Sequence, residues 1–77
     1  MSTPLIQTYK ELVQFFGSQT SAAAALGVEQ PSVSAWLSGK AKMSADTAFR
    51  AQAETNGEFK AVDLRPSLKS SFKRLIA

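Results

Sequence analysis

Cysteine and histidine are both absent from the 77-residue sequence. Without cysteine there are no disulfides and no thiol nucleophile, and without histidine there is no imidazole base and no usual zinc ligand set. The six acidic residues are scattered along the chain and form no obvious acid–base pair. We therefore expect a protein that is not an enzyme and has no catalytic residue, metal, cofactor or small-molecule substrate.

Long apolar runs are also lacking. No apolar stretch approaches the length needed to span a membrane, and the N-terminus, "MSTPLIQTYK", lacks the basic and then apolar pattern of a secretion signal. Hydrophobic residues make up 44% of the chain and charged residues 19%, a composition typical of a globular domain. These features predict a cytoplasmic protein with no membrane partner.

A chain of this length forms at most one domain with a small core, so a second subunit is the expected additional source of stability. The net charge is +3. Residues 1–39 hold one basic and two acidic residues, whereas residues 40–77 hold eight basic and four acidic residues. The positive second half suits an anionic partner such as nucleic acid, although an excess of lysine equally serves solubility.

Start and stop signals predict two helices in the first third of the chain. Thr3 is the expected N-cap of the first helix, residues 4–16, which carries apolar residues at helical spacing. Ser18 is the expected N-cap of the second helix, residues 19–26. Gly27 ends the second helix, because glycine adopts the left-handed backbone that such a turn requires.

The third predicted helix, residues 31–38, has one apolar face and one face of small polar residues. Pro31 is tolerated in a first helical turn because the N–H that it lacks has no partner there, and Gly39 is the next stop. Spacings of three and four predict that the buried face holds Val33, Trp36 and Leu37. The outer face consists of small, uncharged residues, namely Ser32, Ser34, Ala35 and Ser38.

The segment after residue 44 allows two interpretations. Ser44 is a plausible N-cap for a helix over residues 45–55, whose predicted stripe consists of Ala48, Phe49, Gln52 and Ala53. The dipeptide Asn56-Gly57 instead favours an α+β fold with a C-terminal β-hairpin from about residues 47–64. We favour the helix, because three alanines, a glutamine and a glutamate make the first arm a poor strand. Residues 58–65 fit both patterns.

Pro66 begins a basic amphipathic segment at the C-terminal end. Its apolar side holds Leu68, Phe72, Leu75 and Ile76, and the other side mostly holds Lys69, Lys73 and Arg74. We expect a domain over residues 1–66, followed by a tail over residues 67–77 that is helical or partly disordered.

The stretch "ALGVEQPSVSAWLSGK", residues 25–40, joins two short helices through a tight glycine turn, so the second helix can dock across the first. Ala23 is small where the two helices cross. The pattern Q-x-x-x-A-x-x-x-G-V-x-Q-x-x-V-S-x-W, from Gln19 to Trp36, resembles the helix-turn-helix of the Cro and phage-repressor family, including small Cro-like or YdaS-like antitoxin regulators. The segment "TNGEFKAVDLRP" is similar to the C-terminal part of many small Cro-like regulators. The resemblance implies an all-α, five-helix, Cro/repressor-like helix-turn-helix domain that binds DNA.

A helix with a small outer face can approach base edges in the major groove of double-stranded DNA. The candidate base contacts are Gln30, Pro31, Ser32, Ser34 and Ala35. The Gln30 amide can pair with adenine through one donor and one acceptor, and the resemblance implies that a glutamine here contacts DNA. The alternative is that Gln30 caps the helix and that the serines are merely solvated.

The candidate phosphate contacts lie around this helix and are Gln19, Thr20, Ser38, Lys40 and Lys42. Helix capping and ordinary solvation are the alternative roles. Glu29 argues mildly against a DNA contact, because a carboxylate repels phosphate. No arginine or lysine lies between Gln30 and Gly39, so strong guanine readout is not expected.

The predicted homodimer interface has Phe59, Val62 and Leu64 at its centre, and the stripe of Phe72, Leu75 and Ile76 either extends it or covers the subunit's own core. A single DNA-reading helix contacts few base pairs, whereas two such helices related by two-fold symmetry read a palindrome. The resemblance implies a phage or prophage Cro-type repressor that binds its operator as a dimer, in the bacterial or host cytoplasm. The alternative is an antitoxin-like or adaptor protein whose C-terminal helix binds a protein partner.

Overall fold

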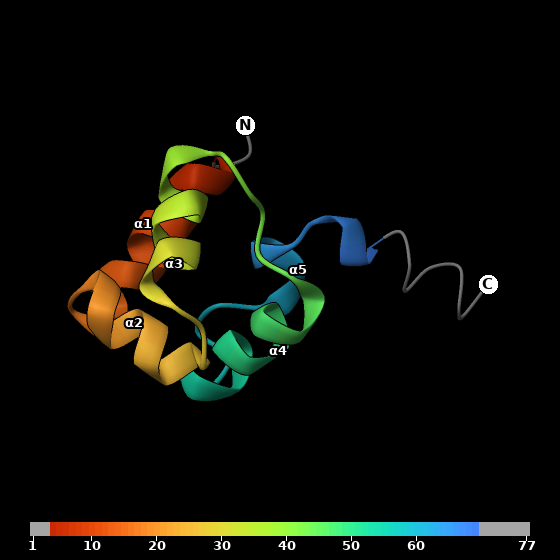
Figure 1. The fold of residues 1–77 in the computed structure, drawn as a ribbon. Helices are drawn as coiled ribbons and strands as arrows, with labels where there is room; N and C mark the ends of the chain where they lie inside the picture. The colour runs from red at the N-terminus through yellow and green to blue at the C-terminus, as the bar shows by residue number, and fades with distance from the viewer. Residues whose placement is uncertain (1–3, 70–77) are drawn as a thin grey trace.

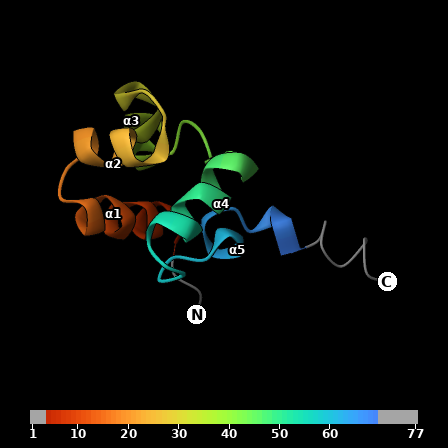
Figure 2. The ribbon, with the colours of Figure 1, turned by 90° about the horizontal axis from the view of Figure 1, so that it is seen from below.

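The computed structural model describes residues 4–69. The helices are α1 (Leu5–Phe16), α2 (Gln19–Leu26), α3 (Gln30–Ser38), α4 (Ala45–Glu54) and α5 (Ala61–Leu64). Residues 4–69 contain no strand, so the predicted all-α fold is confirmed and the hairpin alternative is wrong. In Figure 1 α3 passes in front of α1, and Figure 2 shows the α2–turn–α3 unit on one side of α1. Figure 2 shows α3 at one end of the molecule and α5 at the opposite end, with α1 and α4 between them.

The hairpin alternative fails at the dipeptide that suggested it. Asn56 and Gly57 do have left-handed backbones, with φ of 54° and 81°. These angles, however, end α4 instead of turning a strand, because the Gly57 N–H donates to the Gln52 carbonyl over 2.8 Å. An Asn-Gly pair can therefore adopt left-handed backbone angles at the end of a helix as well as in a hairpin turn.

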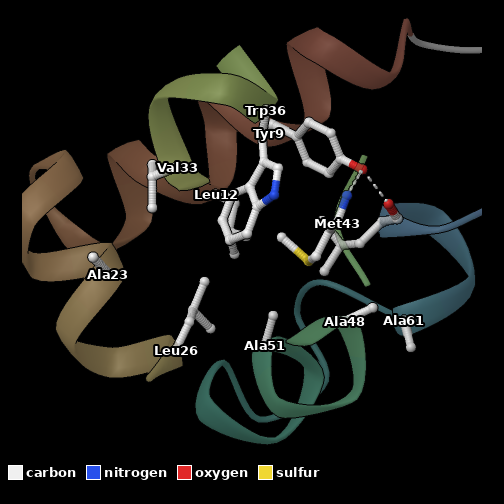
Figure 3. Packing of buried hydrophobic residues seen from close by; sticks show 11 residues of the cluster. Tyr9, Leu12, Ala23, Leu26, Val33, Trp36, Met43, Ala48, Ala51 and Ala61 are labelled. Atoms are coloured by element: carbon white, nitrogen blue, oxygen red, sulfur yellow. Dashed lines mark hydrogen bonds between the residues drawn. The ribbon is translucent and has the colours of Figure 1, made fainter. Parts of the chain in front are cut away.

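One core fills the space between the helices (Figure 3). Its buried members are Tyr9, Leu12, Ala23, Leu26, Val33, Trp36, Met43, Ala48, Ala51, Ala61 and Leu64. The alanines leave little side-chain volume, so the helices that carry them approach their neighbours closely. The predicted inner positions Val33 and Trp36 of α3 are confirmed as core residues.

The predicted stripe of α4 is wrong at Phe49 and Ala53, which are both exposed, and it misses the buried Ala51. Ala48 and Ala51 face the core, whereas Phe49 is 56% exposed. The buried face of α4 follows positions 48, 51 and 55, and position 49 lies about 100° away from the first of these around the helix. The small residues face inward because they let α4 pack closely, and the large aromatic ring is left outside.

The hydroxyl of Tyr9 joins α1 to two distant parts of the chain. It donates to the Leu64 carbonyl over 2.8 Å and accepts from the Met43 N–H over 2.9 Å (Figure 3). Arg65 also donates to the Met43 carbonyl over 2.8 Å. Burial raises the pKa of Tyr9 above its ordinary value, although the Met43 hydrogen bond and the Arg65 charge oppose this.

Side chains of α4 and its C-terminal end fix the start of α5. The Gln52 side-chain oxygen accepts from the Ala61 N–H over 2.8 Å, and the buried Thr55 hydroxyl accepts from the Phe59 N–H over 3.1 Å. The ambiguous residues 58–65 thus form a loop and one helical turn, because these contacts supply partners for their backbone groups.

Beyond α5, residues 67–69 form one further helical turn and Leu68 packs against the core. α1 begins at Leu5 with Pro4 in the N-cap position, so the prediction of Thr3 as N-cap is wrong. The tail residues 70–77, with Phe72, Leu75 and Ile76, lie outside the described residues. The boundary proposed at residue 66 stays a prediction, as does the alternative that depends on a C-terminal helix.

Candidate nucleic-acid interface

Local backbone signals build the α2–turn–α3 unit. The Ser18 hydroxyl accepts from the Ser21 N–H over 3.0 Å, so it caps α2 as predicted. Gly27 has the left-handed φ of 70° that ends α2, and the Val28 N–H then donates to the Ala23 carbonyl over 3.0 Å. This turn allows α3 to cross α2 as the sequence predicted (Figure 1).

Arg50 on α4 holds the end of α2, a role that the sequence did not predict. Its Nε donates over 3.0 Å to the carbonyl of Ala25, in the last turn of α2. A positive charge at a helix C-terminus also complements the helix dipole. The same guanidinium lies against Gly27, where an added Cβ would be 3.0 Å from Nη1. Only the fold brings residues 25 and 50 together, so no local signal marks this contact.

The outer face of α3 is open to solvent. Its exposed residues are Gln30, Pro31, Ser32, Ser34 and Ser38, and Ala35 is half-buried. The N-cap position belongs to Glu29, which makes no side-chain capping bond. Gln30 is therefore the first residue of the helix and not its cap. The structure brings the five predicted base-contact residues onto this one helix.

The predicted phosphate contacts differ in their surroundings. Thr20 is exposed and Gln19 is half-buried, both in the first turn of α2. Lys40 and Lys42 are exposed in the link between α3 and α4. The Ser38 hydroxyl donates to the Ala35 carbonyl over 3.2 Å, so its proton is engaged within α3.

A groove of about 440 Å³ lies beside α3. Its lining residues come from the turn before α3, from α3 itself, from the link that follows and from the start of α4; they are Val28, Pro31, Ser32, Ala35, Trp36, Ala41, Lys42, Ser44 and Thr47. Ser44 also caps α4 by accepting from the Thr47 N–H over 3.3 Å. Its capping role was readable from the sequence, but its place beside α3 was not.

The three predicted interface residues do not share one environment. Phe59 and Val62 are half-buried, and the Phe59 ring packs edge-on against Phe15, with 5.9 Å between the ring centres. Leu64 is fully buried in the subunit's own core. The assignment of Leu64 to an interface is therefore corrected, because this side chain has no surface left to offer a second subunit.

Residues 4–69 contain neither a cluster of metal-ligating side chains nor a membrane span. No group of three or more acidic side chains in this range is arranged to hold a metal ion. No helix in this part of the chain is both long and apolar enough to cross a membrane.

The fold and the open face of α3 define a helix-turn-helix protein of the Cro and YdaS type. Residues 9–71 match the family model described as bacterial toxin YdaS. The chain belongs to this family, so the resemblance noted in the sequence is confirmed.

Two named relatives extend this finding. The regulatory protein Cro of Pseudomonas phage D3 is 54% identical over 59 residues, which cover 77% of this chain and 81% of the phage protein. YdaS of Escherichia coli (strain K12), named as a candidate transcriptional regulator, is 31% identical over 67 residues, which cover 87% of this chain and 68% of that protein. No solved structure matches the chain.

Proposed function

We propose that the protein is a transcriptional regulator that inserts α3 into the major groove of operator DNA. The observation that carries this proposal is the division of α3 into two faces. Val33 and Trp36 anchor the helix in the core, while every exposed residue from Gln30 to Ser38 is uncharged. A helix held this way can approach the floor of the groove without long side chains that would keep its backbone away.

Base readout in this proposal begins at the N-terminal end of α3. The Gln30 amide is free of the capping role and pairs with an adenine, donating to N7 and accepting from the N6 amino group. Ser32 and Ser34 hydrogen-bond to bases, Ala35 offers its methyl group to a thymine methyl, and Pro31 starts the helix. With no arginine or lysine on α3, sequence-dependent DNA shape contributes the rest of the specificity.

Backbone contacts supply affinity on the flanks of α3. Lys40 and Lys42 are exposed beside the helix, and Lys42 lines the groove between α3 and α4. A DNA strand lying along this groove places a phosphate next to the Lys42 ammonium group. Thr20, with Gln19 beside it, contacts the backbone from the start of α2.

Two copies of the chain read a palindromic operator in this proposal. The contact between them uses Phe59 and Val62, whose half-buried side chains leave apolar surface at the end of the molecule that lies away from α3. Both α3 helices thus stay available for DNA. Repression follows when the bound dimer covers a promoter and blocks polymerase. The name of the phage D3 relative, a regulatory protein, supports this role.

Selection of binding sites from random double-stranded DNA tests the proposal. We expect enrichment of an inverted repeat whose half-sites are about 10 base pairs apart, the spacing of one helical turn. Recovery of DNA without any common sequence would contradict specific readout.

The salt dependence of binding to the selected site tests the backbone contacts. Lys42→Ala is expected to lower the slope of log affinity against log salt by about one unit for each phosphate contact that the substitution removes from a half-site. Lys10→Ala is the matched control, since it removes a charge that is also exposed, but on α1. Equal effects of the two substitutions would show that Lys42 acts only through net charge.

A further inference from the structure

A second groove, which DNA binding does not use, lies between α1 and α5. Its volume is about 580 Å³. Its lining residues are Leu5, Thr8, Glu11, Glu58, Phe59, Val62, Asp63, Pro66 and Lys69. Figure 2 shows α5 at the end of the molecule opposite α3, so an occupant of this groove does not compete with DNA at α3.

The groove combines apolar walls with a surplus of negative charge. Its apolar side chains are partly buried and belong to Leu5, Phe59 and Val62. Its acidic side chains belong to Glu11, Glu58 and Asp63 and are all exposed. The only basic residue in the lining is Lys69. The groove therefore suits a segment that has apolar side chains and positive charge.

The C-terminal segment of the chain has this chemistry. Residues 70–77 read "SSFKRLIA", with apolar Phe72, Leu75 and Ile76, basic Lys73 and Arg74, and no acidic residue. The two positive charges complement the carboxylates of the groove, and the three apolar side chains match its walls. In the whole sequence, two basic residues stand next to each other only at this place.

The point from which this segment leaves the molecule indicates whose groove it fills. Residues 66–69 lie beyond α5 at the edge of the molecule (Figure 1), and residues 67–69 are helical. Pro66 and Lys69 themselves line the groove, so residues 70–77 begin at its edge. Phe59 and Val62 line it too, so the proposed dimer contact brings the grooves of the two copies together and puts the segment beside the groove of the second copy.

We propose that residues 70–77 of each subunit dock in the α1–α5 groove of a second copy of the chain. This inference rests on the homodimer of the proposed function and names the contact that holds it. We call this reciprocal docking the exchange. Because the dimer has two-fold symmetry, each subunit gives its segment to the other and both grooves are filled. The exchange buries the Phe59 and Val62 side chains and pairs Lys73 and Arg74 with the carboxylates.

Two charge-reversal variants of the full chain test the exchange. The groove variant is Glu58→Lys with Asp63→Lys, and the tail variant is Lys73→Glu with Arg74→Glu. Sedimentation equilibrium without DNA is expected to show a dimer dissociation constant raised by about tenfold or more for each variant alone, because like charges then face each other. Circular dichroism establishes that each variant is folded.

An equimolar mixture of the two variants is the decisive sample. In the heterodimer, the reversed tail of one variant faces the reversed groove of the other, so their charges attract. The second tail and the second groove are both native. We therefore expect the dissociation constant of the mixture to return to within about threefold of the native value. A mixture that stays monomeric overturns the exchange, and so does native association by either variant alone.

The outcomes also separate this inference from the proposed function. If both charge-reversal variants still form the dimer but Phe59→Asp does not, the tail contact is overturned. The operator-binding dimer of the proposed function then still stands. A native chain that is monomeric at all micromolar concentrations overturns the dimer and the exchange together. Site selection on DNA is read separately and decides whether α3 binds DNA.

Discussion

The α2–turn–α3 unit and the α4–loop–α5 segment are held together by different kinds of interaction. The first is built mainly by residues close in sequence, such as the Ser18 cap and the left-handed turns at Gly27 and Gly39, with one added contact from Arg50. The second adds to the local Gln52 and Thr55 contacts a side chain from far along the chain, since Tyr9 bonds the Leu64 carbonyl 55 residues away. We therefore expect the contacts of Tyr9 to contribute more to stability than the exposed side chains of α3 do.

The largest expected effect comes from removing the Tyr9 hydroxyl. Tyr9→Phe leaves the Leu64 carbonyl and the Met43 N–H buried without their side-chain partner. Each of the two unsatisfied groups costs about 1–3 kcal/mol, so we expect the free energy of unfolding to fall by about 2–6 kcal/mol. Urea denaturation measures this change. A loss below about 0.5 kcal/mol would mean that the contacts around Tyr9 are not the main long-range support.

A smaller effect is expected in the turn between α2 and α3. Gly27→Ala places a side chain on a left-handed residue and against Arg50, and we expect a loss of about 1–2 kcal/mol. Gly57→Ala is the matched control, because its φ is 81° and nothing lies within 4 Å of its added Cβ. The difference between the two losses in urea denaturation isolates the Arg50 contact. Identical losses would show that only backbone strain matters.

The smallest expected effect is a pH dependence that belongs to Tyr9. Its folded-state pKa is raised above its unfolded value of about 10, mainly by burial. The unfolded chain then releases this proton more readily, so the contribution to stability is intact below about pH 10 and is lost as pH rises further. We expect the stability difference between the native chain and Tyr9→Phe to shrink as pH rises above about 10. A constant difference would contradict the raised pKa.

The sequence predicted the α2–turn–α3 unit much better than the α4–loop–α5 segment. The Ser18 cap and Gly27 set the limits of α2, Gly39 set the end of α3, and the spacing of Val33 and Trp36 identified the inner face of α3. Those signals act within a few residues, so they can be read without the fold.

The segment after residue 44 was harder to predict, because its structure depends on distant partners. Leu64 was assigned to an interface although it completes the core, and Phe49 was assigned inward although alanines occupy the inner face of α4. The Arg50 contact with α2 and the position of Ser44 beside α3 appear only when the helices are packed together.

We propose that α3 reads DNA through an exposed face that contributes little to stability. The variant Gln30→Ala separates the two properties when affinity for the selected site, affinity for unrelated DNA and the free energy of unfolding are measured together. We predict that specific binding weakens by about 1–3 kcal/mol and that preference is relaxed at one base position, while the other two quantities stay nearly unchanged. An equal loss of affinity for both kinds of DNA, or a comparable loss of stability, would contradict the claim.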